Sequence, residues 1–258
     1  MDAANATLVA RVDLTATVAR FLVAWDEGRP DFRPGQYLAL GLLDGDRILQ
    51  RPYSTASTAP TASGADRGGP LEFLIRRVEG GALTPRLWAV APGDRVRIGR
   101  PKGLFTLLPE DPRTHLFVAT GTGIAPFISM LEALLGGPRP PRVLVVHGVS
   151  RPDELGYRER LEAWAARRPG IGYRPTISRP AEGGSAGWSG LTGRAEAVLD
   201  RVCDEAALDP RDSVAYLCGN PEMIVSAGRI LATRGFPAAA IRSEQYWPAA
   251  PAPNRAAA

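Results

Sequence analysis

Cysteine, histidine and lysine are scarce in this chain of 258 residues, which holds two cysteines, two histidines and one lysine. Cys203 and Cys218 are too few for a disulfide framework or a four-cysteine iron–sulfur site, and we expect no metal site. Long hydrophobic runs are also missing, since none approaches the roughly 20 residues that span a bilayer. The first ten residues have neither the basic start nor the long apolar core of a secretory signal, so a cytoplasmic location follows as the default.

A surplus of one charge sign is absent as well. The net charge is +4, from 31 basic and 27 acidic residues, and 14 of the basic and 12 of the acidic side chains lie in the first 110 residues. Nucleic-acid binding would need a concentrated basic face, and this even spread argues against it. Because Lys102 is the only lysine, nearly all basic residues are arginines, so the position of an arginine carries more weight than its presence.

The first 108 residues have the pattern of a small antiparallel β-barrel. Apolar and polar residues alternate through Leu8–Val23, which predicts a long strand or a hairpin. Further strands are predicted at Gln36–Leu40, Leu71–Val78 and Asp94–Arg100, with turns rich in glycine and proline between them. Short strands at this spacing, with few helical stretches, favour a barrel domain over residues 1–108.

From His115 onward, apolar strands alternate with helices, which predicts a parallel sheet with right-handed crossovers. This α/β domain is expected over residues 109–247, followed by a disordered Pro/Ala-rich tail at 248–258. The predicted strands are His115–Ala119, Arg142–His147, Gly172–Ile177 and Val214–Cys218, and the predicted helices are Ala125–Leu135, Asp153–Arg168, Ala195–Val202 and Pro221–Arg234.

Two glycine-containing turns follow strands of the predicted parallel sheet. Gly121 and Gly123 lie between a strand and a helix, where glycines let a pyrophosphate approach backbone N–H groups at the helix start. A tight strand–helix turn with no ligand explains them equally well. Cys218 and Gly219 end another strand, and in such sheets ligands lie at the carboxyl ends of the strands, so both turns can line one crevice. Taken alone, Cys218 is better explained as a buried core cysteine.

Arginines follow other elements of the same domain. Arg151 comes after the second strand, Ser178 and Arg179 after the third, and Arg194 directly before a helix. Bidentate arginines and a hydroxyl suit the 2′-phosphate of a dinucleotide, whereas a site for NAD more often has a carboxylate. Each arginine alone fits a solvated surface charge, but three at one crevice favour a phosphate site.

The barrel domain contains two motifs that suit a planar ring with a phosphate tail. In Arg51-Pro52-Tyr53-Ser54, which comes after a strand candidate, the tyrosine can stack, the serine can hydrogen-bond a ring nitrogen and the arginine can pair with a phosphate. Pro52 biases Arg51 towards an extended conformation. Further on, Gly81 precedes Thr84, which is expected to cap a short helix with Pro85 at its first position, leaving an anion site at the helix start.

In order and spacing, these segments resemble the ferredoxin–NADP⁺ reductase family, most of all its bacterial ferredoxin/flavodoxin–NADP⁺ reductases, which end in an aromatic residue. The resemblance spans roughly residues 8–247. It rests on Arg51–Ser54, Gly81–Thr84, Gly103–Leu107, Gly121–Pro126, Ser178-Arg179, Cys218–Asn220 and Ser243–Trp247. Eleven residues follow Trp247, whereas relatives of this kind usually stop at or near the aromatic.

The resemblance implies a six-stranded antiparallel FAD barrel followed by an NADP-binding α/β domain, with FAD bound non-covalently. It places Tyr53 on the flavin ring, Ser54 near its N5 atom, and Tyr246 or Trp247 on the other face. Glu244 resembles a carboxylate that assists proton handling, and Cys218 lies beside the nicotinamide, so the implied catalytic residues are Ser54, Cys218, Glu244 and Tyr246. The implied FAD-binding residues are Arg51, Pro52, Tyr53, Ser54, Gly81, Leu83, Thr84, Thr122, Tyr246 and Trp247. The implied NADP-binding residues are Gly121, Thr122, Gly123, Arg151, Ser178, Arg179, Arg194, Cys218 and Gly219.

The implied reaction is FAD-dependent electron transfer between NADP(H) and a one-electron carrier, by hydride exchange between nicotinamide C4 and flavin N5. We expect a monomer that works with an acidic ferredoxin or flavodoxin, attracted by a basic rim that includes Arg67, Arg76, Arg77 and Arg100. Two alternatives stay open. The chain can be an NADH-dependent reductase component of an oxygenase system, or a non-catalytic module whose bound flavin reports redox state.

Overall fold

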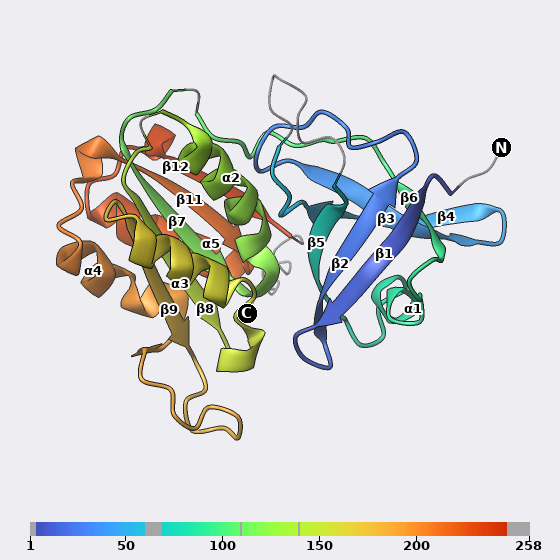
Figure 1. The fold of residues 1–258 in the computed structure, drawn as a ribbon. Helices are drawn as coiled ribbons and strands as arrows, with labels where there is room; N and C mark the ends of the chain where they lie inside the picture. The colour runs from blue at the N-terminus through green and yellow to red at the C-terminus, as the bar shows by residue number, and fades with distance from the viewer. Residues whose placement is uncertain (1–3, 60–68, 109, 139, 247–258) are drawn as a thin grey trace, which may run out of the picture.

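The structure is a computed structural model that describes residues 4–59, 69–108, 110–138 and 140–246. The predicted tail at 248–258 and Trp247 therefore lie outside the described residues, as does Arg67 of the predicted basic rim. Two domains lie side by side, with the first drawn in blue to blue-green and the second in green to red (Figure 1).

The first domain, called here the barrel domain, is an antiparallel sheet with strand order β4-β3-β6-β1-β2-β5. Its two edge strands are joined by a bridge between Thr55 and Phe73, so the sheet closes on itself around buried side chains such as Phe21 and Leu38. This confirms the predicted antiparallel barrel. Its elements are β1 (Ala6–Asp13), β2 (Val18–Trp25), β3 (Tyr37–Asp44), β4 (Arg47–Ser54), β5 (Leu71–Arg76), α1 (Thr84–Leu87) and β6 (Arg95–Ile98).

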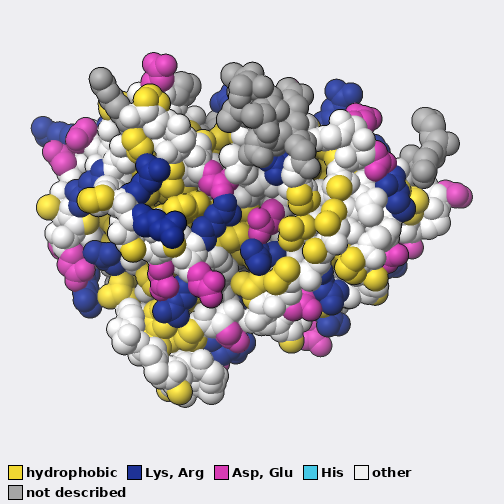
Figure 2. Space-filling model, viewed as in Figure 1, with side chains coloured by type: hydrophobic (Ala, Val, Ile, Leu, Met, Phe, Trp, Pro, Cys, Tyr) yellow, Lys and Arg dark blue, Asp and Glu magenta, His cyan; other side chains and the backbone are white. Residues whose placement is uncertain are grey.

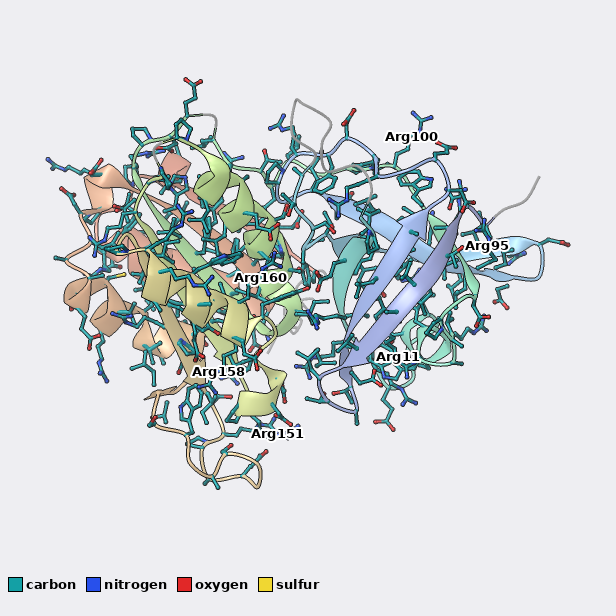
Figure 3. The ribbon with its side chains drawn as sticks, viewed as in Figure 1. Arg11, Arg95, Arg100, Arg151, Arg158 and Arg160 are labelled. Carbon is teal, nitrogen blue, oxygen red and sulfur yellow. The ribbon has the colours of Figure 1, made fainter. Side chains whose placement is uncertain are left out.

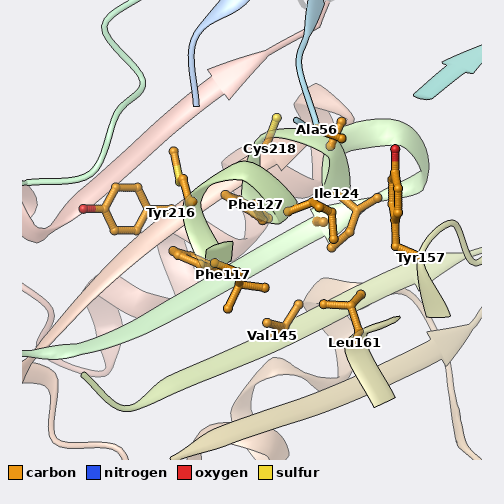
Figure 4. Close-up of a cluster of buried hydrophobic side chains, with 14 of the residues drawn as sticks. Ala56, Phe117, Ile124, Phe127, Val145, Tyr157, Leu161, Tyr216 and Cys218 are labelled. Carbon is orange, nitrogen blue, oxygen red and sulfur yellow. The ribbon is translucent and has the colours of Figure 1, made fainter. Parts of the chain in front are cut away.

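The second domain, the α/β domain, is a parallel sheet with strand order β10-β9-β8-β7-β11-β12. Helices α2 and α3 pack on one face, and α4 and α5 on the other (Figure 1). Under α2, Phe117 and Phe127 stack with ring centroids 4.7 Å apart in an aromatic cluster (Figure 4). The strands are β7 (Thr114–Thr120), β8 (Val143–Val149), β9 (Ile171–Ile177), β10 (Leu191–Thr192), β11 (Ser213–Gly219) and β12 (Ile241–Gln245); the helices are α2 (Ala125–Gly136), α3 (Arg158–Arg167), α4 (Ala195–Glu205) and α5 (Pro221–Thr233).

Two expectations about local structure are corrected, and one open alternative is decided. The helix predicted over Asp153–Arg168 is divided into a 3-10 turn, η2 (Pro152–Glu154), and α3, because Tyr157 adopts a left-handed conformation with φ of 62°. Of the two alternatives for Leu8–Val23, the hairpin is confirmed, and it is formed by β1 and β2. The strands β4, β10 and β12 were not predicted, and β4 already contains the Arg51–Ser54 motif that was placed after a strand.

Contacts between the domains fix the space between them. The Arg76 guanidinium of β5 donates to the buried carboxylate of Glu154 on η2 at 2.6 Å. The hydroxyl of Thr58 donates to Glu132 on α2. Gly156 lies against the side chain of Leu74, where a Cβ atom would be only 2.7 Å from a leucine methyl carbon, so a larger residue would push the domains apart.

Candidate functional site

A cleft of about 650 Å³ lies between the two domains. Basic and hydrophobic side chains gather over the junction of the domains in Figure 2. The barrel domain contributes the end of β4, β5 and the turn before α1, and the α/β domain contributes the carboxyl ends of its strands. The predicted site residues in the lining are Arg51, Pro52, Tyr53, Ser54, Gly81, Leu83, Thr84, Gly121, Thr122, Ser178, Arg179, Arg194, Gly219 and Tyr246.

The end of β4 presents Tyr53 and Ser54 to the cleft. Pairing with β3 sets Tyr53 opposite Leu38 and Ser54 opposite Tyr37, which holds this segment extended. Burial raises the pKa of Tyr53 to about 12, so the phenol stays neutral at physiological pH. Arg51 is exposed, and its guanidinium donates to the carbonyl of Gln50 at 2.8 Å.

The four predicted catalytic side chains meet where β4, β11 and β12 come together. The Ser54 hydroxyl donates to Glu244 Oε2 at 3.2 Å, and Cys218 is the register partner of Glu244 on the adjacent strand. The Tyr246 hydroxyl donates to the carbonyl of Thr122 at 3.1 Å, so Tyr246 ties the end of β12 to the glycine turn after β7. Ser54 and Glu244 are 190 positions apart in the sequence.

Burial sets the protonation state of this cluster. It raises the pKa of Glu244 to about 7, and the hydrogen bond from Ser54 opposes that rise by stabilising the carboxylate. Burial also raises the pKa of the Cys218 thiol, with the nearby Glu244 carboxylate adding to the effect, so Cys218 is a neutral thiol at pH 7. The cluster can therefore exchange a proton at Glu244 near neutral pH, while Cys218 stays uncharged.

The glycine turns at the ends of β7 and β11 are shaped by close backbone contact. Gly121 has a φ of 54° and Gly219 a φ of 126°, conformations that favour glycine. A Cβ atom on Gly123 would collide with the backbone of Cys218, and one on Gly219 would collide with Thr120. The two strand ends thus lie against each other, and the resulting turns leave backbone room for a ligand at the helix start. Gly123 and Cys218 lie behind this surface rather than in the cleft lining.

His147, near the end of β8, supports the same turn and was not predicted. Burial lowers its pKa to about 4, so the imidazole is neutral at pH 7. Its Nε2 atom lies 3.0 Å from the carbonyl of Gly121 and must carry the proton, because a carbonyl can only accept. The Tyr173 hydroxyl then donates to Nδ1 at 3.4 Å, which fixes the ring orientation.

The turn before α1 differs from its prediction. Leu83, not Thr84, is the N-cap residue, and its side chain makes no capping hydrogen bond. Thr84 is the first helical residue, and its hydroxyl accepts a hydrogen bond from the backbone N–H of Val78 at 2.8 Å. The hydroxyl is thus partly committed to holding the turn, because the segment folds back on β5. Gly81, Leu83 and Thr84 still line the cleft.

The three arginines predicted to bind the 2′-phosphate, Arg151, Arg179 and Arg194, all form ion pairs with carboxylates. Arg179 and Arg194 line the cleft together with Ser178. Arg151 lies just outside that lining, with a guanidinium nitrogen 3.3 Å from Glu154 and another 3.5 Å from Glu182. Arg194 Nη1 lies 3.5 Å from Glu222 and 3.9 Å from Glu196.

The predicted basic rim is only partly available. Arg76 is not a free rim charge, because it pairs with Glu154 between the domains. Arg77 and Arg100 are exposed. No described helix is long and apolar enough to cross a membrane, and the described residues hold no group of three or more His, Cys, Asp and Glu side chains able to bind a metal.

Several lining residues were not among the predicted binding residues. They are Leu74, Arg76, Val78, Ala82, Thr120, Gly148, Val149, Ser150, Glu154, Ala195, Glu196, Asn220 and Met223. The rule that ligands lie at the carboxyl ends of parallel strands would have found 148–150, which directly follow the predicted second strand. Arg76 and Glu154 carry no such pattern, because only domain packing brings them together.

Comparison with known proteins gives matches over both domains. The family model described as oxidoreductase FAD-binding domain matches residues 5–107, and the oxidoreductase NAD-binding domain matches residues 117–228. Ferredoxin–NADP reductase B of Sorangium cellulosum (strain So ce56) is 36% identical over 222 residues, 83% of this chain and 85% of that protein. The toluate 1,2-dioxygenase electron transfer component of Pseudomonas putida is 30% identical over 83% of this chain and 59% of that protein. Among solved structures, a ferredoxin NADP⁺ reductase from Neisseria gonorrhoeae with bound FAD and NADP is 25% identical, with a TM-score of 0.79 over 94% of this chain and 98% of that one.

Proposed function

Because this chain belongs to the ferredoxin–NADP reductase family of oxidoreductases, with an FAD-binding and an NAD-binding domain, we propose that it takes electrons from NADPH and delivers them singly to a ferredoxin or flavodoxin. Electron transfer with FAD and a nicotinamide dinucleotide is the activity of the family. The finer proposal rests on one observation. A single cleft joins Tyr53 and Ser54 of one domain to Ser178, Arg179 and Arg194 of the other.

The barrel side of the cleft fits FAD. Tyr53 offers a half-buried neutral ring for stacking, and Arg51 is exposed at the rim as a phosphate partner. The turn at 81–84 supplies backbone groups on the same side. When bound, FAD would supply the chemistry that links a two-electron nicotinamide donor to a one-electron carrier. The hydrogen bond between Ser54 and Glu244 would hold a proton at the Ser54 hydroxyl. Because the pKa of Glu244 is about 7, this carboxyl group can gain or lose a proton at neutral pH.

The α/β side of the cleft suits the dinucleotide. Gly121 and Thr122 lie at the start of the η1 turn (Gly121–Ile124) that leads into α2, where backbone N–H groups favour a pyrophosphate. His147 holds this turn through the Gly121 carbonyl and so acts as a positioning residue. Tyr246 lines the cleft and is tied to Thr122, so we propose that its ring must move before the nicotinamide can approach Ser54.

The carrier is proposed to dock near the joint between the domains. Leu104 is 87% exposed, an unusual exposure for a leucine, and exposed basic side chains of Arg100 and Lys102 lie beside it in the sequence. A hydrophobic contact with positive charge beside it favours an acidic protein partner. The net charge of +4 agrees with this choice.

In an Arg100→Ala/Lys102→Ala double variant, reduction of ferredoxin should slow about two- to fivefold at low salt while reduction of ferricyanide stays unchanged.

A second candidate is an NADH-dependent reductase component of an oxygenase system. It is favoured by the similarity to the toluate 1,2-dioxygenase electron transfer component and by the carboxylates that pair with the arginines. Such carboxylates reduce the positive charge available for a 2′-phosphate.

Steady-state kinetics with NADPH and NADH separate the two candidates. The wild type should prefer NADPH, and Arg179→Ala should raise the KM for NADPH about tenfold while leaving that for NADH unchanged, because it removes a charge-assisted hydrogen bond to phosphate. Arg201→Ala is the control, since Arg201 is an exposed arginine on α4 paired with Glu205. A wild type that prefers NADH would refute the NADPH proposal.

Anaerobic addition of NADPH should bleach the flavin, and no bleaching would favour the redox-reporting module.

A further inference from the structure

Glu182 bridges two of the arginines that the proposed function assigns to the 2′-phosphate. One carboxylate oxygen lies 3.3 Å from Arg179 Nη1, and the other lies 3.5 Å from Arg151 Nη1. Glu182 belongs to the loop between β9 and β10. Arg151, which is labelled in Figure 3, directly precedes η2. A single carboxylate therefore brings together two cationic side chains from separate loops at the edge of the cleft.

The loop holds Glu182 in this place. The backbone N–H of Glu182 donates to the carbonyl of Arg179 at 3.3 Å, and that of Ser185 donates to the carbonyl of Glu182 at 3.2 Å. The Ser185 hydroxyl adds a hydrogen bond to the Arg179 carbonyl at 3.0 Å. Further along, the Trp188 indole donates to the Leu191 carbonyl at 2.9 Å and anchors the loop against the domain. Glu182 therefore lies on a structured turn.

Arg151 has two further carboxylate partners, the buried Glu154 and the exposed Asp153, whose Oδ1 atom lies 3.8 Å from Arg151 Nε. Glu182 is the partner that also binds Arg179, and it differs from the buried one. The Glu154 side chain is 4% exposed and is also bound by Arg76, so it cannot leave without breaking a contact between the domains. The Glu182 side chain is 47% exposed and can turn into solvent. Because exposed ion pairs are weak, a bound phosphate can displace this carboxylate, and the displacement reduces its affinity without preventing binding.

We infer that Glu182 occupies the place of the 2′-phosphate in the ligand-free protein and thereby sets the discrimination between NADPH and NADH. The inference rests on the proposed function, because it needs Arg179 and Arg151 to receive that phosphate. The 2′-phosphate of NADPH must displace Glu182 from both arginines and then remain near the negative charge of the Glu182 carboxylate. NADH has no 2′-phosphate and meets neither obstacle. Glu182 is thus a specificity-determining residue that restrains NADPH preference.

Binding of two nucleotides that differ only in the 2′-phosphate tests this directly. Adenosine 2′,5′-bisphosphate and adenosine 5′-monophosphate are titrated calorimetrically into FAD-loaded wild type, Glu182→Gln and Glu205→Gln. Glu205 is the matched control, a 43% exposed carboxylate paired with Arg201 on α4. In Glu182→Gln the Kd of the bisphosphate should fall about three- to tenfold, the size expected for removing one partly screened charge near the phosphate. The Kd of the monophosphate should not change, and Glu205→Gln should match the wild type for both.

Two results would overturn the inference. An unchanged Kd of the bisphosphate in Glu182→Gln means that the carboxylate does not compete, and weaker binding of the monophosphate means that Glu182 instead holds a ribose hydroxyl. Titration of Arg179→Ala separates this inference from the proposed function. If Arg179→Ala weakens bisphosphate binding but Glu182→Gln does not strengthen it, only the role of Glu182 is refuted. If the wild type binds both nucleotides equally and Arg179→Ala changes neither, the 2′-phosphate site fails and the inference fails with it.

Discussion

The hydrogen bond between Ser54 and Glu244 leads to a quantitative prediction for Ser54→Ala. The hydroxyl donates to the Glu244 carboxylate at 3.2 Å, and this bond lowers a pKa that burial has raised from 4.5 to about 7. A net hydrogen bond of this kind contributes about 1 kcal/mol, and 1.36 kcal/mol corresponds to about one pKa unit. Removing the hydroxyl should therefore raise the pKa of Glu244 by about 0.7 units, to nearly 8.

Carbon-13 NMR of protein labelled at the glutamate carboxyl carbons measures this pKa. In the oxidised wild type, one glutamate should titrate near pH 7, well above the others, and its signal should be missing in Glu244→Gln, which assigns it. In Ser54→Ala the same signal should have a higher midpoint. If all glutamates titrate below about pH 5.5 in the wild type, burial does not control Glu244; if the midpoint falls in Ser54→Ala, the serine does not stabilise the carboxylate.

The same raised pKa makes stability depend on pH. Because the pKa of Glu244 in the folded protein, about 7, is above its ordinary value of 4.5, the folded state holds the proton more tightly. The contribution of Glu244 to the free energy of unfolding is fully present below pH 4.5. It is lost as the pH rises through about 7, a change of about 3 kcal/mol. Urea unfolding at pH 5 and pH 8 should show this loss in the wild type and a smaller loss in Glu244→Gln. Equal losses of unfolding free energy in the two proteins would contradict the link between Glu244 protonation and stability.

Other predictions concern the cleft walls and the contact between the domains. Gly219→Ala should weaken binding of the nicotinamide dinucleotide at least tenfold, because φ is 126° and a Cβ atom would collide with β7. Gly228→Ala on α5 is the control, because a Cβ atom there meets nothing within 4 Å. It should stabilise the protein by about 0.5–1 kcal/mol. Equal effects of the two changes on binding would refute the steric argument. Tyr246→Phe loses the hydrogen bond to Thr122 and should lower the KM for NADPH about fivefold with an unaltered flavin spectrum, so an unchanged KM argues against a gate. Glu154→Ala leaves two arginines without their shared buried carboxylate and should lower the melting temperature by about 5 °C, whereas an unshifted melting curve shows that this contact does not hold the domains together.

The sequence alone was enough for the fold class, and it named residues from both domains that the structure brings together in one cleft. Alternation of apolar residues predicts the barrel, and short apolar strands between helices predict the parallel sheet, because these periodicities reflect which side of each element is buried. Gly121 and Gly219 could be recognised because their turns need conformations that glycine favours. Such features are local, so they can be read from neighbouring residues.

Only the tertiary structure decided which groups act on one another. Ser54 meets Glu244 across 190 positions, and burial at that meeting point moves the carboxyl pKa to about 7. The sequence predicted three arginines at one crevice but did not predict that Glu182 joins Arg179 to Arg151. Charge pairing and burial depend on how two domains and several loops pack in space, and no local periodicity encodes that packing.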